Sequence, residues 1–166
     1  MIKQKLTIVC GLPGAGKTVV ARLVSTMRGA ALLRSDVLRK DVLITPTYTD
    51  DEKQAVYGEM FKRARCSLLK GRDVVLDAAF NKETNRKKAA SLAKALEADF
   101  EIVEVTSSEE TIRDRLRHRE GDESEADWQV YQLLKQRFER IDEPHIIVTN
   151  DGDLASLEQR VHRLLP

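Results

Sequence analysis

Residues 11–18, GLPGAGKT, combine residue types and spacing that suit phosphate binding. They fit the pattern G-x-x-x-x-G-K-[ST], directly after a strand-like apolar run and at the start of a helical pattern. The glycines let successive backbone N–H groups point at one phosphate, and the helix N-terminus adds its positive dipole end. Lys17 can supply a point charge to the β- and γ-phosphates. A glycine-rich turn that binds nothing is the weaker interpretation, because both flanks match a phosphate-binding loop.

This loop predicts ATP and Mg²⁺ as ligands. Thr18 can offer its hydroxyl to the metal, and Asp77, which ends the strand-like run 74–77, would lie near the same ion. Many strands end in aspartate, so the assignment of Asp77 depends on the loop. The residues expected to bind the nucleotide are Gly11, Leu12, Pro13, Gly14, Ala15, Gly16, Lys17, Thr18 and Val19.

A second carboxylate lies among cations in LLRSDVLRK, residues 32–40. Asp36 follows a strand-like run, so it would emerge at the carboxyl edge of the sheet, where open α/β folds bind ligands. A carboxylate there can accept the proton of a hydroxyl that attacks the γ-phosphoryl group. The alternative is that Ser35 or Asp36 only caps a helix. Whether Asp36 or Asp77 is the base stays open, as does the role of Arg34.

Arginines crowd the segment TIRDRLRHRE, residues 111–120. Phosphoryl transfer spreads negative charge over the γ-oxygens, and arginines can stabilise that charge. With the acidic residues that follow, the segment predicts a lid over about residues 113–126 that closes on the site. The alternative is a salt-bridged surface helix in which Glu109 and Glu110 pair with Arg113.

The elements that must position these residues alternate along the chain. Apolar runs at 6–10, 30–33, 73–77, 100–105 and 145–149 read as strands covered on both faces, with helical patterns between them. The alternation predicts a parallel sheet with right-handed crossovers, in one domain over residues 1–166. Helix starts are expected at three pairs with capping-box or related spacing, which are Thr49 with Glu52, Ser107 with Glu110, and Ser124 with Asp127.

Composition excludes several classes of protein. The chain has 166 residues, of which 42% are hydrophobic and 33% charged, so it is globular rather than disordered. The net charge of +1 provides no general field for nucleic acid or membranes. The basic cluster NRKKAA, residues 85–90, lacks interleaved aromatics, so nucleic acid is possible as a partner but not favoured. No apolar run approaches 18 residues, and we expect a cytoplasmic protein that does not enter membranes.

Other proteins with this loop fit less well. A GTPase needs an Asn-Lys-x-Asp order to read guanine, and TNDGD, residues 149–153, lacks it. We interpret that segment as a turn before a helix that starts at Leu154. Mechanochemical AAA ATPases are usually longer and carry an added helical domain.

Several segments together resemble a known family. They are GLPGAGKT, LRSDVLRK, YTDDEKQAVYGEMFKRARCSLLKGRDVVLDAAF, RDRLRHR and SEADWQVYQ. The chain resembles the small P-loop kinase-like ATP-binding proteins of the AAA_33 type. These are related to zeta toxins, chloramphenicol phosphotransferase, gluconate kinase and the kinase domain of polynucleotide kinase. The resemblance implies a three-layer α/β P-loop NTPase fold, with a five-stranded parallel sheet of order 2-3-1-4-5 and an arginine-bearing lid.

The resemblance also implies roles for single residues. Asp36 would be the general base and Arg39 an acceptor-side contact, so that Asp36, Arg39 and Asp77 form the substrate side. Arg115 would stack on adenine, and Arg119 would reach the phosphates from the lid. Arg86 would touch substrate or the γ-phosphate. Relatives often have a threonine where this chain has Ala79, so a contact from that position is in doubt.

We therefore expect an ATP- and Mg²⁺-dependent phosphotransferase that acts on a hydroxyl of a small-molecule acceptor. The catalytic residues would be Lys17, Asp36, Arg86 and Arg119. The alternatives are an ATP-binding regulatory or toxin-like module and a polynucleotide 5′-kinase. The sequence identifies neither the acceptor nor the oligomeric state.

Overall fold

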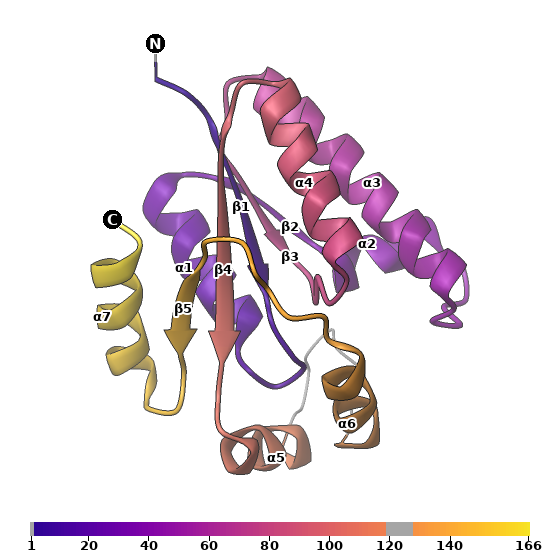
Figure 1. Ribbon diagram of the computed structural model, residues 1–166, viewed down its shortest axis with the longest axis vertical. Helices are drawn as coiled ribbons and strands as arrows, with labels where there is room; N and C mark the ends of the chain where they lie inside the picture. Colours follow the sequence, from indigo (N-terminus) through magenta and orange to yellow (C-terminus); the bar gives the residue numbers. More distant parts are fainter. Residues whose placement is uncertain (1, 119–127) are drawn as a thin grey trace.

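A single parallel sheet forms the centre of the molecule. The computed structural model describes residues 2–118 and 128–166. The strands pair in the order β2-β3-β1-β4-β5, as the resemblance implied, and all neighbours run parallel (Figure 1). The strand bounds are β1 Lys5–Cys10, β2 Ala31–Arg34, β3 Val74–Asp77, β4 Asp99–Thr106 and β5 Ile146–Thr149.

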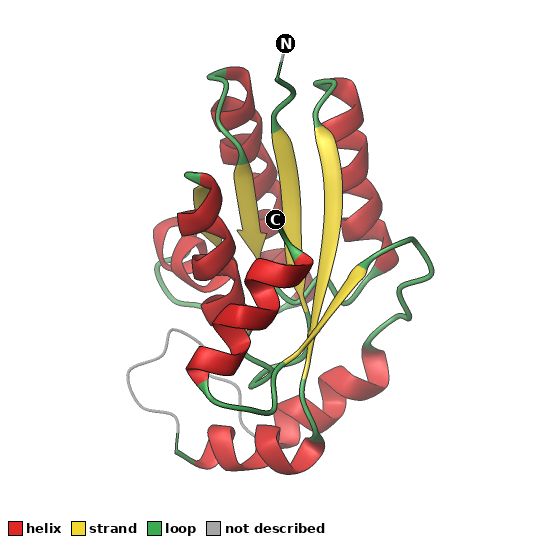
Figure 2. Ribbon diagram, turned by 90° about the vertical axis from the view of Figure 1, so that its left-hand side faces the viewer, coloured by secondary structure: helices red, strands yellow, loops and turns green. Residues whose placement is uncertain are grey.

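Helices cover both faces of this sheet. The helix bounds are α1 Lys17–Arg28, α2 Ser35–Val42, α3 Asp50–Leu69, α4 Glu83–Ala95, α5 Glu109–Arg117, α6 Trp128–Arg137 and α7 Leu154–Leu164. Helices α1 and α7 lie on one face and α3 and α4 on the other, while α5 and α6 lie below the carboxyl ends of the strands (Figures 1 and 2). No helix in the described ranges is both long and apolar enough to cross a bilayer.

The central strand β1 is buried on both faces, which explains its continuous apolar run. Leu6 and Ile8 point into the core beneath α3 and α4. Val9 points into the core beneath α1 and α7. Successive side chains of a strand face opposite sides, so both cores depend on this one segment. The register pairs Val9 with Asp77 of β3, which brings Asp77 to the carboxyl edge beside the phosphate loop.

Caps set where the helices begin. Thr49 and Glu52 form the predicted capping box at the start of α3. The prediction for α5 was one residue too early, because Ser108 is the N-cap and accepts from the Thr111 N–H at 3.2 Å. Ser107 instead donates its hydroxyl to the carbonyl of Asn150 at 2.6 Å. The third predicted pair, Ser124 and Asp127, lies outside the described residues.

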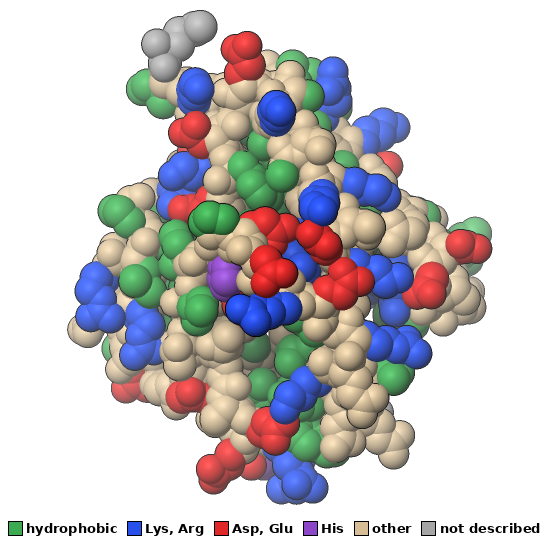
Figure 3. Space-filling model, viewed as in Figure 1, with side chains coloured by type: hydrophobic (Ala, Val, Ile, Leu, Met, Phe, Trp, Pro, Cys, Tyr) green, Lys and Arg blue, Asp and Glu red, His purple; other side chains and the backbone are tan. Residues whose placement is uncertain are grey.

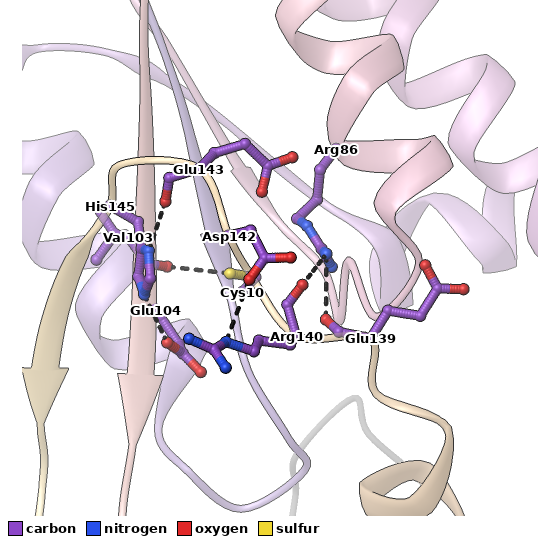
Figure 4. A network of polar contacts seen from close by, with 9 residues as sticks. All are labelled: Cys10, Arg86, Val103, Glu104, Glu139, Arg140, Asp142, Glu143 and His145. Atoms are coloured by element: carbon purple, nitrogen blue, oxygen red, sulfur yellow. Dashed lines mark hydrogen bonds and ion pairs between the residues drawn. The ribbon is translucent and has the colours of Figure 1, made fainter.

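The structure places Arg86 among buried loop carbonyls, where the resemblance implied a contact with substrate or the γ-phosphate. Its side chain is 1% exposed and crosses from α4 to the segment before β5 (Figure 4). The guanidinium donates to the carbonyls of Phe80 at 2.7 Å, and of Glu139 and Arg140 at 3.1 Å each. A buried carbonyl needs a donor, so Arg86 ties two loops together inside the protein.

We expect Arg86→Met to destabilise the fold by about 2–4 kcal/mol, because it leaves buried carbonyls without a donor. Urea denaturation would measure this loss. Lys88→Met is the matched control, since Lys88 is exposed on the same helix. A variant of normal stability that had lost only ATP or acceptor binding would restore the original assignment of Arg86.

Candidate active site

The phosphate loop joins β1 to α1 and has space only for glycine at its key positions. Gly14 and Gly16 have φ of 79° and 96°, a region that L side chains rarely adopt. A Cβ on Gly16 would lie 2.2 Å from Nδ2 of Asn150, and one on Gly11 would lie 2.4 Å from the carbonyl oxygen of Val105. The bare backbone here fits a cradle for phosphate oxygens.

Side chains from two other loops hold this cradle from behind. The carbonyl of Ala15 accepts from Nδ2 of Asn150 at 3.0 Å, and the hydroxyl oxygen of Ser107 lies 3.2 Å from it. Arg115 donates to the carbonyl of Gly14 at 3.2 Å and to that of Asn150 at 2.7 Å. Asn150 is 6% exposed. These contacts occupy the loop's carbonyls on one side and fix the orientation of its peptide groups.

Arg115 therefore lies against the nucleotide-binding loop. Burial of its guanidinium lowers the pKa of Arg115, while Asp151 partly offsets the effect. Its stacking on adenine stays a prediction. Asn150 lies in the segment that the sequence identified only as a turn, and its amide contact with the loop was missed, because no local pattern marks a contact between residues 135 positions apart.

The residues expected near Mg²⁺ come together. The Thr18 hydroxyl donates to a carboxylate oxygen of Asp77 at 2.7 Å, and Asp77 is 5% exposed. Arg34 completes the cluster, with Nε 3.3 Å from the same oxygen of Asp77 and Nη2 3.2 Å from the Thr18 hydroxyl. Arg34 thus pairs with Asp77 and not chiefly with Asp36.

This donor set fits Mg²⁺, which prefers oxygen ligands. The described residues contain no group of three or more His, Cys, Asp or Glu side chains that could hold a metal by themselves. A magnesium ion held by Thr18 and Asp77 would take its remaining ligands from phosphate oxygens and water, as is usual for this ion.

A cavity of about 410 Å³ opens beside the loop. It brings the predicted Lys17, Thr18, Asp36, Arg39 and Asp77 to one surface. Several lining residues had no assigned role in the sequence, and they come from α3, the loops before it and after β3, and α6: Tyr48, Lys53, Val56, Tyr57, Ala78, Ala79, Asn81, Val130 and Leu134. Sequence spacing carries little signal for such residues, because the fold gathers them from distant segments.

Asp36 lies in the first turn of α2. The helix N-cap is Arg34, so neither Ser35 nor Asp36 serves as the cap. One carboxylate oxygen of Asp36 is 3.3 Å from Nη1 of Arg39, and its side chain is 30% exposed. Burial raises the pKa of Asp36, and the nearby Lys17 and Arg39 oppose this effect. A carboxylate with a raised pKa is better suited to accept a proton near neutral pH than an ordinary aspartate.

Other predicted nucleotide contacts lie on the far side of the loop. Gly11, Leu12 and Ala15 line a second cavity of about 310 Å³, whereas Pro13, Gly14, Gly16 and Val19 line the first. Phosphates are bound by backbone N–H groups. The cavity that Gly11, Leu12 and Ala15 line therefore does not test whether these three residues contact the nucleotide.

The lid prediction falls largely outside the described residues. Arg119 and residues 120–126 are among those not described. The predicted pairing of Arg113 with Glu109 is wrong, because Arg113 lies over the ring of Trp128 at 5.1 Å, and Glu109 pairs with Lys135 of α6. Contacts between α5 and α6 thus replace the expected pair within one helix.

Surface charge does not favour nucleic acid on the face that Figure 3 draws. Acidic side chains gather near its centre, and basic ones are interspersed around them. A nucleic-acid site usually needs a continuous basic surface.

Solved structures similar to this chain include two kinases and a third protein in complex with a nucleotide. The APS kinase CysC of Mycobacterium tuberculosis, solved with AMPPNP and APS, has a TM-score of 0.73 at 19% identity over 99% of both chains. A gluconokinase from Sinorhizobium meliloti 1021 has a TM-score of 0.71 at 20% identity, over 96% of this chain and 89% of its own. Kti12 of Chaetomium thermophilum, solved with ADP-AlF3, has a TM-score of 0.73 at 22% identity, over 95% and 96%. The fold is that of P-loop kinases.

A family model described as an AAA domain, AAA_33, matches residues 6–141, and the protein belongs to this family. Among curated proteins, Rv2004c of Mycobacterium tuberculosis (strain ATCC 25618 / H37Rv) and Mb2027c of Mycobacterium bovis are each 28% identical over 95% of this chain. Both are uncharacterized. The chain spans about a third of their length, or 34%.

We expect Gly16→Ala to weaken ATP binding by at least about tenfold and the fold by about 2–4 kcal/mol, because the methyl group would meet Asn150 and strain the loop. Titration with a fluorescent ATP analogue and urea denaturation would measure both effects. Gly29→Ala is the control. Its φ is 62° and its Cβ would meet nothing within 4 Å, so it should cost about 1–2 kcal/mol and leave ATP affinity unchanged. Equal ATP affinities in the two variants would refute a tightly packed cradle.

The raised pKa of Asp36 predicts a pH-dependent effect on stability. When folding raises the pKa of a carboxyl group above its ordinary value of 3.8, protonation favours the folded state. The group therefore adds stability below pH 3.8, and this stability is lost as the pH rises through the folded pKa. Ionised Asp36 therefore costs stability at neutral pH. We expect ligand-free Asp36→Asn to melt above the wild type at pH 7, with the difference shrinking toward pH 3. Asp41→Asn, on the same helix, should show no such gain. An Asp36→Asn protein less stable than wild type at pH 7 would refute the direction.

Proposed function

We propose that this protein is a phosphotransferase that moves the γ-phosphoryl group of ATP to a hydroxyl of a small-molecule acceptor. One observation carries the proposal: a single cavity is lined by the phosphate loop, the Thr18–Asp77 pair and Asp36. A part-buried carboxylate in the same cavity as the loop lysine suits the proton acceptor that a hydroxyl substrate needs. The P-loop kinase fold supports the same reading.

The proposed transfer forms one bond to the γ-phosphorus and breaks another. The acceptor hydroxyl oxygen attacks the γ-phosphorus, and the bond from that phosphorus to the β,γ-bridging oxygen breaks with its electron pair, releasing ADP. Asp36 accepts the proton of the hydroxyl. Lys17 and the loop N–H groups hold the phosphates and balance their charge. A bound magnesium ion would neutralise phosphate charge, held by Thr18 and Asp77.

Three side chains act around this centre in the proposal. Arg34 orients Asp77, since it binds the carboxylate and the Thr18 hydroxyl together. Arg39 orients Asp36 through their ion pair. Arg119 would neutralise charge on the transferring group, as its place in the sequence motif indicates.

We expect Asp36→Asn to lower turnover by about 10²–10⁴-fold while the Kd for ATP stays within about threefold. The assay is ADP formation with and without a panel of sugars, sugar acids, nucleosides, amino-sugar antibiotics and 5′-hydroxyl oligonucleotides. Asp41→Asn is the control, because Asp41 lies on α2 and pairs with Arg63 at 3.3 Å, outside the cavity lining.

Stimulation by one acceptor class, lost in Asp36→Asn, would support the proposal. Normal transfer by the variant would refute Asp36 as the base. A response that is flat across the panel despite tight ATP binding would favour a regulatory module, and label transfer to oligonucleotides alone would favour a polynucleotide kinase.

A further inference from the structure

The cavity has a second wall, which is the part of its lining that elements other than the phosphate loop and β3 supply. It is built from α2, the loop before α3, the first turns of α3, and α6, through Asp36, Arg39, Tyr48, Lys53, Val130 and Leu134. The nucleotide and metal have their own partners in Lys17, Thr18 and Asp77. The second wall is therefore where an acceptor would contact the protein, and its charge indicates what kind of acceptor fits.

Arg39 has hydrogen-bonding capacity that the protein does not use. Its side chain is 12% exposed, and Nη1 lies 3.3 Å from Asp36. Its Nε is buried without any hydrogen-bond partner in the described part of the chain. A buried guanidinium N–H that lacks an acceptor is unfavourable, so the described residues leave the Arg39 guanidinium incompletely hydrogen-bonded.

Lys53 adds a second positive charge on the same wall. The described residues supply no hydrogen bond or ion pair to its ammonium group. The neighbouring carboxylate of Glu52 is already occupied, because it accepts from the Thr47 N–H at 2.9 and 2.8 Å and from the Thr49 N–H at 3.3 Å. Lys53 therefore remains available to an anion in the cavity.

Tyr48 lies in a strained backbone conformation beside these cations. Its φ is 58°, a left-handed value that is uncommon for a tyrosine. The hydrogen bonds from Thr47 and Thr49 to Glu52 surround it and hold this conformation. The guanidinium carbon of Arg39 lies 4.7 Å from the centre of the Tyr48 ring. Strain of this kind persists where the surroundings impose it and is concentrated at ligand sites.

We propose that the acceptor is a hydroxyl compound with an anionic group, a carboxylate or a phosphate ester, bound between Arg39 and Lys53. This inference rests on the proposed function and deepens it. Asp36 partly balances Arg39, and Lys53 has no ion pair with the described residues, so together the two cations leave positive charge in the cavity for an anion. Val130 and Leu134 supply an apolar surface for the carbon chain of the acceptor.

The test compares matched acceptors that differ in charge. ADP formation is measured with glycerol, glycerate and glycerol 3-phosphate, and with glucitol, gluconate and 6-phosphogluconate. We expect an anionic member to have the lower KM, and Lys53→Met to raise that KM about 10- to 100-fold with kcat within about threefold. KM for the neutral member and the Kd for ATP should not change. Whether the carboxylate or the phosphate ester has the lower KM identifies the anionic group that the site prefers.

Lys62→Met is the matched control, since Lys62 is exposed on the same helix and does not line the cavity. The inference would be overturned if neutral acceptors had KM values as low as those of anionic ones. It would also be overturned if Lys53→Met raised the KM of both kinds equally.

A binding experiment separates this inference from the proposed function. Calorimetric titration of glycerate, gluconate and glycerol 3-phosphate into the protein loaded with AMPPNP and Mg²⁺ requires no transfer. Binding that is weakened in Lys53→Met but retained in Lys62→Met, together with no ADP formation from ATP with any of the acceptors, would refute the phosphotransferase and keep the anion site. Absence of any Lys53-dependent binding would overturn the anion site, even if a neutral acceptor were phosphorylated.

Discussion

The carbonyl of Ala15 is the point on which the geometry of the site depends. Asn150 donates to it, the Ser107 hydroxyl lies 3.2 Å from it, and Arg115 donates to the carbonyl one residue earlier. These donors come from the ends of β4 and β5 and from α5, so the loop is bound to three other elements of the carboxyl edge. A loop with its carbonyls held on one side can present its N–H groups on the other without further ordering, which is how preorganised phosphate sites gain affinity.

Charge in the cavity is divided between two walls. On the nucleotide side, Arg34 and Thr18 engage Asp77. On the other side, Asp36 and Arg39 form an ion pair in a part-buried setting, where burial raises the pKa of the carboxyl group. The separation gives two similar carboxylates different environments. Asp77 is engaged by Thr18 and Arg34, and Asp36 is placed to exchange a proton.

Single residues show why sequence interpretation succeeded or failed. Lys17, Thr18 and Asp77 meet in one cavity as expected, because each belongs to a short motif at the end of a recognisable strand. Arg86 was misassigned, since a recurrent arginine in a motif does not reveal whether it faces a ligand or, as here, buried carbonyls. Lys53 and Asn150 were not singled out, because only the fold brings Lys53 to the cavity and Asn150 to the carbonyl of Ala15.

By itself, the sequence determined the alternation of strands and helices, the glycine loop and the family, because these follow from hydrophobic periodicity and from local motifs. The order of the strands came from family resemblance, and the register confirmed it by pairing Val9 with Asp77. Only the tertiary structure decided that Arg34 binds Asp77, that Arg86 is internal, and that Arg39, Tyr48 and Lys53 share one wall. Some of these contacts join residues that are far apart in the sequence. Others depend on the direction in which a side chain points within one helical turn. Packing against the sheet, and not spacing along the chain, fixes both kinds of contact.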